Sequence, residues 1–187
     1  MRPLVTPRLR LEPLTVAHAD VLFAMHCDPL HQRFLDHGAP ASLQALRERH
    51  AKLESRRSAD GREHWLNWAL VALDDDSAGG ALGVVQATVL EDGTAWIAYE
   101  VTRTHWGRGL AGEAVRAMLP HLAQHYGAQR FLATVDGRNE RSWRLLERLD
   151  FERASDAAAR AMDVRSGDWL YQRAASREIS ERERTGP

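Results

Sequence analysis

The chain has 187 residues, and its 25 basic and 26 acidic side chains leave a formal net charge of −1. This length suits a single domain with a sizeable core, and the balanced charge argues against non-specific nucleic-acid binding. No apolar run is long enough to span a bilayer, and the N-terminus lacks the apolar segment of a secretory signal. The single cysteine, Cys27, excludes an intramolecular disulfide and a thiolate-rich metal site. We therefore expect a cytoplasmic protein without a membrane or nucleic-acid partner.

The N-terminal part predicts one strand and two helices. Apolar and charged residues alternate over residues 9–11, which favours a short strand. A helix is expected from a cap at Thr15, and it should end at Asp28-Pro29 because the residue before a proline disfavours the α conformation. A loop over residues 37–40 then leads to a polar helix over residues 42–53.

The middle of the chain predicts an antiparallel meander. Three apolar runs cover residues 65–73, 82–90 and 96–101, and turn-forming residues separate them. The turn at residues 74–80 is rich in Asp and Gly, and the turn at residues 91–93 is of the hairpin kind.

The C-terminal part alternates helices and strands. Apolar spacing predicts a helix over residues 110–126, bent at Pro120 and capped by Gly127. A strand over residues 130–135 follows, and a further helix starts at Asn139 or Ser142. A hairpin is expected over residues 163–173.

The resulting order, β-α-α-β-β-β-α-β-α-β-β, predicts an α/β domain with a mixed sheet. We expect this single domain to cover residues 1–175. Residues 176–187 are almost entirely polar and are expected to form a flexible tail.

A glycine-rich segment, residues 107–112, lies between a predicted strand and a predicted helix. Such a segment can bind a phosphate, because helix N-terminal N–H groups point at the anion and glycines let it approach closely. Its G-x-G-x-x-G pattern, with Asp136 after the next strand, also matches dinucleotide-binding proteins and would indicate an NAD(P)-linked oxidoreductase. Against this, residues 102–106 separate the strand from the glycines, the strand belongs to a meander, and no second βαβ half follows. The glycines would also suit a simple tight turn.

Residues 99–114 resemble the acetyl-CoA-binding segment of the GNAT N-acetyltransferases. In that family a strand and a short loop precede an Arg/Gln-x-x-Gly-x-Gly/Ala motif and a helix. Trp106, Gly109 and Ala111 stand at the motif positions here. The run Trp-Gly-Arg-Gly is most similar to the branch of ribosomal-protein N-terminal acetyltransferases, the RimJ/RimL type.

Two further segments resemble the same branch. They are the opening Thr-Pro-Arg-Leu-Arg-Leu at residues 6–11 and the Asn-x-x-Ser segment at residues 139–151. Asp150 replaces a usual glycine at a helix end, where Asp tolerates the left-handed conformation better than most residues. Many GNAT members carry a tyrosine acid near the position of Leu146, so that mechanism is not available at this position.

The resemblance implies the GNAT fold, a mixed and mostly antiparallel sheet with helices on both faces. It also implies acetyl transfer from acetyl-CoA to a primary amine, on a protein N-terminus or a small molecule, and a homodimer. The strand around Val101 and the side chain of Asn139 would contact the pantetheine arm, although Asn139 fits a helix cap equally well. The implied cofactor-binding residues are Val101, Trp106, Gly107, Arg108, Gly109, Leu110, Ala111, Gly112, Asn139 and Ser142.

Three residues are candidates for catalysis. The resemblance implies that Ser142 faces the sulfur of CoA, although a serine in the first turn of a helix is also a common cap. The amine must lose a proton, and Glu100 and Asp163 are the two carboxylates proposed to accept it. Each fits a plain surface charge as well. Because no base is certain, a non-catalytic acyl-CoA-binding module stays open.

Two histidines on the predicted helix over residues 110–126 raise the question of a metal. His121 and His125 are spaced i, i+4, but no glutamate follows His121 and no third ligand is evident. We therefore expect surface histidines and no metal site.

Overall fold

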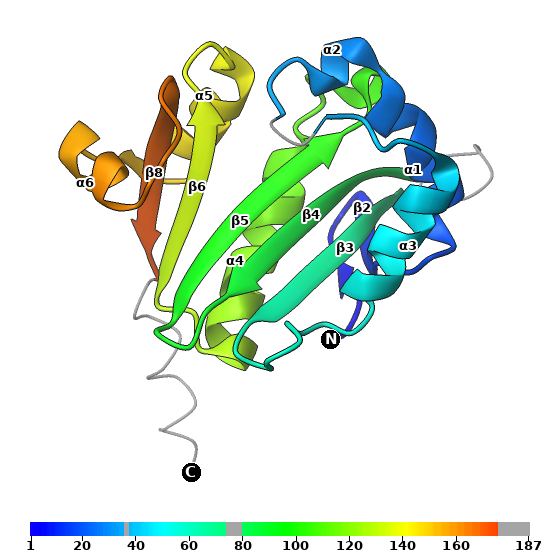
Figure 1. The fold of residues 1–187 in the computed structure, drawn as a ribbon, viewed down its shortest axis with the longest axis horizontal. Coiled ribbons are helices and arrows are strands. Elements are labelled where there is room, and N and C mark those ends of the chain that lie inside the picture. Colours follow the sequence, from blue (N-terminus) through cyan, green and yellow to red (C-terminus); the bar gives the residue numbers. More distant parts are fainter. Residues whose placement is uncertain (36–37, 74–79, 176–187) are drawn as a thin grey trace.

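The computed structural model describes residues 1–35, 38–73 and 80–175. Figure 1 shows one twisted sheet with helices packed against it. The elements are β1 (Leu4–Val5), β2 (Leu9–Pro13), α1 (His18–Cys27), α2 (Pro29–Gln32), α3 (Leu43–Leu53), β3 (His64–Ala72), β4 (Ala81–Val89), β5 (Thr94–Val101), the 3₁₀ turn η1 (Arg103–His105), α4 (Leu110–Tyr126), β6 (Arg130–Asp136), α5 (Glu140–Glu147), β7 (Glu152–Arg153), α6 (Asp156–Ala161) and β8 (Asp168–Ala174).

The sheet has eight strands in the order β1-β2-β3-β4-β5-β6-β8-β7. Every neighbouring pair is antiparallel except β5 and β6, which run parallel. This exception follows from connectivity, since α4 connects the two strands and a helical crossover returns the chain in the same direction.

Apolar residues on both faces of the sheet are buried by helices. Because side chains alternate along a strand, Val85 of β4 joins the core beneath α4, while Val84 packs with Leu22 and Met25 of α1. Leu53 of α3 lies against this second cluster. The expected mixed sheet with helices on both faces is therefore confirmed.

The pairing between β5 and β6 covers only the first part of each strand. The ladder joins Thr94 to Arg130 and ends where Trp96 faces Leu132. Beyond that point the two strands diverge, as Figure 1 shows. Residues 97–101 of β5 therefore have a sheet partner on one side only, which is β4. This split leaves backbone groups of β5 available to a ligand.

A glycine in β4 allows the close approach of β5 at the split. A Cβ at Gly83 would lie 2.2 Å from the carbonyl oxygen of Glu100 and 2.9 Å from the Cα of Val101. Any side chain at this position would push the end of β5 away. Gly83 thus sets the position of the strand segment that forms the site.

Most sequence-predicted elements are confirmed, but the last hairpin and the start of the first helix differ, and β1, α2, α6 and β7 were not predicted. The hairpin expected over residues 163–173 is wrong: only its second half is a strand, β8, which pairs with β6 and β7, and the unpredicted helix α6 precedes it. Thr15 does not cap α1, whose N-cap is Ala17. Asp28 ends α1 as expected, but it also accepts a hydrogen bond from the Leu30 amide and so caps α2.

Several further expectations can be placed. Pro120 lies inside α4, which continues to Tyr126 and ends at the left-handed Gly127. Three expected features lie wholly or partly outside the described residues. They are the loop at residues 37–40, the turn at residues 74–80 and the tail at residues 176–187. Within the described part of the chain, no helix is both long and apolar enough to cross a membrane.

Candidate active site

The glycine loop has a backbone that side-chain-bearing residues rarely adopt. Gly107 and Gly109 have φ angles of 75° and 77°, in the left-handed region, and Gly109 is the N-cap of α4. The first helical hydrogen bond runs from the amide of Glu113 to the carbonyl of Gly109. The amides of residues 110–112 therefore precede the hydrogen-bonded ladder, at the positive end of a long helix, which is the arrangement that binds a phosphate.

The N-terminal strand region holds this loop in place through Glu113. Glu113 accepts hydrogen bonds from the Thr6 hydroxyl at 2.6 Å and the Arg8 amide at 2.9 Å, and it forms an ion pair with the Arg8 guanidinium at 2.6 Å. Arg8 also donates to the carbonyl of Arg108 at 2.8 Å. We call these contacts of Thr6, Arg8, Arg108 and Glu113 the loop clamp. The clamp gives a physical role to the Thr-Pro-Arg motif.

The clamp depends on the charge of Glu113. Burial acts to raise the pKa of this carboxyl, but hydrogen bonds from Thr6 and Arg8 outweigh it and hold the pKa below its ordinary value. A lowered folded-state pKa means that the stabilisation is complete above the ordinary value and is lost as the pH falls through the lowered one.

Replacing Glu113 should therefore loosen the loop. We expect Glu113→Gln to weaken CoA binding by roughly tenfold, which corresponds to about 1.4 kcal/mol, and to lower the Tm by a few degrees. Isothermal titration and thermal melting measure the two effects. The matched control is Glu140→Gln, which removes an exposed i, i+4 pair with Arg144 on α5. Equal CoA affinities for the two variants would contradict the clamp.

Trp106 connects the loop to the split end of β5. Its indole N–H donates to the carbonyl of Val101 at 2.6 Å, and Arg141 of α5 stacks over its ring at 5.0 Å. The Val101 carbonyl, one of the groups expected to contact pantetheine, is thus already paired. The backbone amide of Thr102 donates a hydrogen bond to the backbone carbonyl of Leu82 in β4. Because backbone groups alternate along a strand, the N–H of Val101 points to the opposite edge, toward the split.

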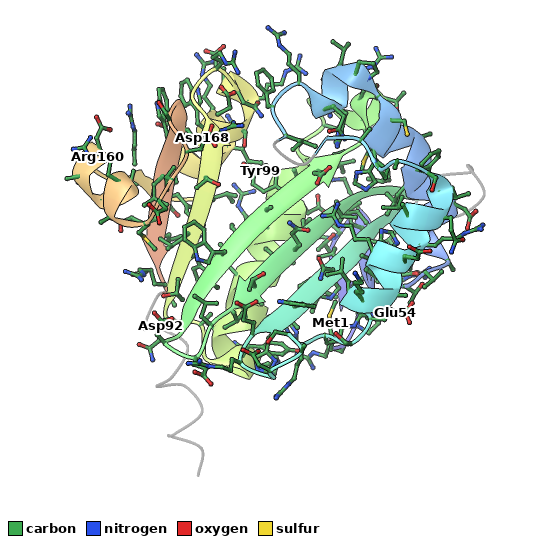
Figure 2. The ribbon with its side chains drawn as sticks, viewed as in Figure 1. Met1, Glu54, Asp92, Tyr99, Arg160 and Asp168 are labelled. Carbon is green, nitrogen blue, oxygen red and sulfur yellow. The ribbon has the colours of Figure 1, made fainter. Side chains whose placement is uncertain are left out.

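On the α5 side of the sheet, Tyr99 reaches Ser142. The phenol is within hydrogen-bond distance of the Ser142 carbonyl, to which it can donate at 3.0 Å, and of the Ser142 Oγ at 2.9 Å, where either hydroxyl can be the donor. Burial raises the pKa of Tyr99 to about 12, and the phenol stays protonated. Figure 2 labels Tyr99 near the C-terminal end of β5. Asn139 is the N-cap of α5 and accepts a hydrogen bond from the Ser142 amide at 3.3 Å, while its contact with pantetheine stays a prediction.

On the opposite side of the sheet, two histidines converge on Glu100. His31 Nε2 lies 2.6 Å from Oε2 of Glu100, and His26 Nδ1 lies 3.6 Å from the same oxygen. The three donor atoms lie within 4.8 Å of one another, the spacing of a metal-ligand set. However, the contact of 2.6 Å is a hydrogen bond, and two ligands of one zinc ion at bonds of about 2.0–2.1 Å would lie farther apart.

The remaining predicted residues lie elsewhere. Asp163 is exposed in the loop before β8, with a φ of 52°, and β6 separates β8 from β5 in the sheet order. The structure therefore does not bring it to Glu100. Asp136 is bound by the side chain and amide of Arg138, whose hydrogen bonds lower its pKa to about 2. β5, the strand before the glycines, is antiparallel to β4 and pairs with β6 over its first three residues only, and the Asp136 carboxylate is occupied. Neither observation favours the dinucleotide hypothesis.

We expected both histidines of α4 to lie at the surface, and this is wrong for His121. His125 is paired with Arg2 at the surface, but His121 is buried, and its ring nitrogens have no hydrogen-bond partner among the described residues. Burial lowers the pKa of His121 to about 4, so the ring is neutral at pH 7.

Sequence reasoning missed Tyr99, His31 and the loop clamp as parts of the site. Strand alternation could have predicted the position of Tyr99, since it places Tyr99 on the face of β5 opposite Glu100. His31 is part of a four-residue helix with no apolar periodicity, and nothing in its neighbourhood signals a contact with β5.

Comparison with known proteins identifies the family. The family model described as "Acetyltransferase (GNAT) domain" matches residues 8–152. The chain belongs to the GNAT acetyltransferases. This GNAT chain is similar to the uncharacterized N-acetyltransferase p20 of Bacillus licheniformis. The two are 27% identical over 153 aligned residues, which make up 82% of this chain and 84% of that protein.

Solved structures of other GNAT proteins share the fold. An acetyltransferase of the GNAT family from Bacillus anthracis superposes with a TM-score of 0.73 at 15% identity, covering 92% of this chain and 98% of that one. RimL, a ribosomal L7/L12 alpha-N-protein acetyltransferase solved with coenzyme A, gives a TM-score of 0.73 at 18% identity, covering 91% and 96%. The expected GNAT fold is thereby confirmed, while the RimJ/RimL type stays a prediction, and the GNAT family uses acetyl-CoA as acetyl donor.

Proposed function

We propose that this GNAT protein transfers the acetyl group of acetyl-CoA to a primary amine by direct attack on the thioester. The observation that carries the proposal is the combination of a split β5–β6 pair with a left-handed glycine loop at the start of α4. The split exposes strand backbone where an acetyl group would lie, and the loop offers amides to the pyrophosphate. A primary amine on a peptide N-terminus or on a small molecule is the proposed acceptor.

The backbone of β5 and its side chains on the two faces of the sheet have different proposed roles. The Val101 N–H, which points into the split, is the proposed donor to the oxyanion that forms when the amine attacks. Glu100 faces α1 and α2 on one side and is the proposed acceptor of the amine proton, in preference to Asp163. Tyr99 and Ser142 lie on the other side, next to α5.

Ser142 and Tyr99 are proposed to stabilise the leaving thiolate. If the Ser142 hydroxyl turns toward the sulfur, the Tyr99 proton can move from the Ser142 carbonyl to Oγ, because the phenol lies within hydrogen-bond distance of both oxygens. The thiolate then receives a charge-assisted hydrogen bond while every hydroxyl keeps an acceptor. Burial raises the pKa of this phenol to about 12, so it is protonated at neutral pH and can donate.

We expect Ser142→Ala to lower kcat by roughly 10- to 100-fold, since a hydrogen bond to a charged group contributes about 1.5–3 kcal/mol. The affinity for acetyl-CoA should change by less than about threefold. Steady-state kinetics and titration of acetyl-CoA separate the two. The matched control is Ser155→Ala, which removes a helix cap on α6 away from β5. An unchanged kcat in Ser142→Ala would assign this serine a purely structural role.

Thermal melting tests the choice of cofactor. A ligand at 100 times its Kd stabilises a protein by about 2.7 kcal/mol, which should raise the Tm by roughly 5–10 °C for a domain of this size. We expect such a rise with acetyl-CoA and CoA and none with NAD or NADP. A rise with NAD or NADP alone would overturn the assignment of the glycine loop.

A further inference from the structure

The carboxylate of Glu100 is held in a small histidine cluster formed by three elements. His26 comes from α1, His31 from α2 and Glu100 from β5. The exposed fractions of their side chains are 6%, 6% and 10%. Both rings approach one oxygen, Oε2, and they pack edge to face with 6.2 Å between centroids. A charged group shielded this far from water needs a partner, and His31 supplies a direct hydrogen bond.

A lone carboxylate is poorly matched to the reaction proposed above. Carboxyl groups ordinarily titrate near pH 4.3, whereas an α-amine titrates near 8 and a lysine near 10.4. A proton moved from an ammonium ion to an isolated carboxylate is therefore held weakly. An imidazole ordinarily titrates near pH 6.5, which lies closer to the amine. A carboxylate joined to an imidazole by a short hydrogen bond can keep the proton between them.

We propose that Glu100 and His31 form a proton relay that takes the proton of the incoming ammonium ion. The inference rests on the proposed amine acetylation. Glu100 accepts the proton, and the proton is then shared between its Oε2 and Nε2 of His31, the atoms that lie 2.6 Å apart. His31 acts through Glu100 and is a positioning residue that also stores the proton.

The balance of the step is complete without a further reactant. The N–H bond of the ammonium breaks, and its electron pair forms the new C–N bond to the acetyl carbon. The C–S bond then breaks, with its electron pair going to sulfur. The second proton lost by nitrogen neutralises the thiolate, and the proton held by the relay passes to solvent before the next cycle.

The described groups near the relay include His26 and one ion pair. His26 Nδ1 lies 3.6 Å from Oε2, beyond a direct hydrogen bond. Asp28, between α1 and α2, pairs with Arg103 of η1 at 3.1 Å, so the charges of this pair balance each other. Replacing His26 should therefore have a smaller effect than replacing His31.

The test compares His31→Gln, Glu100→Gln and the double variant, with His125→Gln as a histidine control on the far end of α4. We expect His31→Gln to lower kcat/KM about 10- to 100-fold with the affinity for acetyl-CoA unchanged, and His125→Gln to match the wild type. Because the two residues act as a unit, the double variant should be no slower than Glu100→Gln alone.

A further variant, His31→Ala, tests the role of the imidazole ring itself. Added imidazole should increase the activity of His31→Ala at least about tenfold, which a structural role would not allow. Multiplying effects in the double variant, or no rescue, would overturn the relay.

A second measurement separates failure of the relay from failure of the proposed function. If the wild type binds acetyl-CoA but releases no CoA with any amine, the amine acetylation fails. The relay is then tested by following the ring signals of His31 by NMR. We expect these ring signals to change in Glu100→Gln at a fixed pH, because the replacement alters the contact of 2.6 Å between Oε2 and Nε2. Unchanged ring signals would show that the two groups do not share a proton.

Discussion

Gly109→Asp is expected to weaken CoA binding by at least about 100-fold, which corresponds to about 2.7 kcal/mol. Gly109 has a φ of 77° and forms the N-cap of α4, directly before the free amides of the helix. An aspartate tolerates this backbone better than most residues, so the helix should still form. Its carboxylate would then occupy the site at which the pyrophosphate is proposed to bind. Titration of CoA and acetyl-CoA into the purified variant measures the loss.

Gly109→Asn is the matched control for this experiment. Asparagine has nearly the same shape and the same tolerance of the left-handed region, but it carries no charge. A Cβ at this position would lie 3.6 Å from an Arg8 nitrogen, so both variants meet the same surroundings. We expect the asparagine variant to lose far less affinity than the aspartate variant. If the two variants bind CoA equally well, the loop amides do not hold its phosphates.

Glu100→Gln is expected to lower kcat about 10²- to 10³-fold, in the range typical of a lost general base. The affinity for acetyl-CoA should stay within about threefold, since Glu100 faces α1 and α2 rather than the glycine loop. The rise of the rate toward alkaline pH should also flatten, because the titrating proton acceptor is gone. Steady-state kinetics across pH, with a saturating amine, give both results.

Asp163→Asn is the control that decides between the two predicted carboxylates. Asp163 lies exposed before β8, and β6 separates β8 from β5. Its replacement should change kcat by less than about twofold. If Asp163→Asn lowers kcat while Glu100→Gln does not, the proposed assignment of the base is reversed. If neither variant changes the pH profile, water or the substrate itself carries the proton.

Local signals explain why most of the fold could be predicted. The meander of β3, β4 and β5 is visible in apolar runs with turn residues between them, and the left-handed Gly107 and Gly109 are visible as glycines before an amphipathic helix. The two sides of β5 followed from strand alternation, which separates Glu100 from Tyr99. The homodimer and the cytoplasmic location stay predictions.

Long-range contacts explain what could not be predicted. His31 and Glu100 are 69 positions apart in the chain, and Arg8 and Glu113 are 105 apart. No local pattern encodes such a pair. The false hairpin over residues 163–173 has a similar cause: β8 is completed by β6 and β7, so residues 163–167 are not needed as a strand.

The most direct test of the account is the release of CoA from acetyl-CoA in the presence of an amine panel. The panel holds short peptides with free N-termini, the same peptides with blocked N-termini, and small primary amines. We predict CoA release that depends on a free amine, together with an acetylated product detected by mass spectrometry. Tight acetyl-CoA binding with no amine-dependent release from any member of the panel would contradict catalysis and leave a module that only binds acyl-CoA.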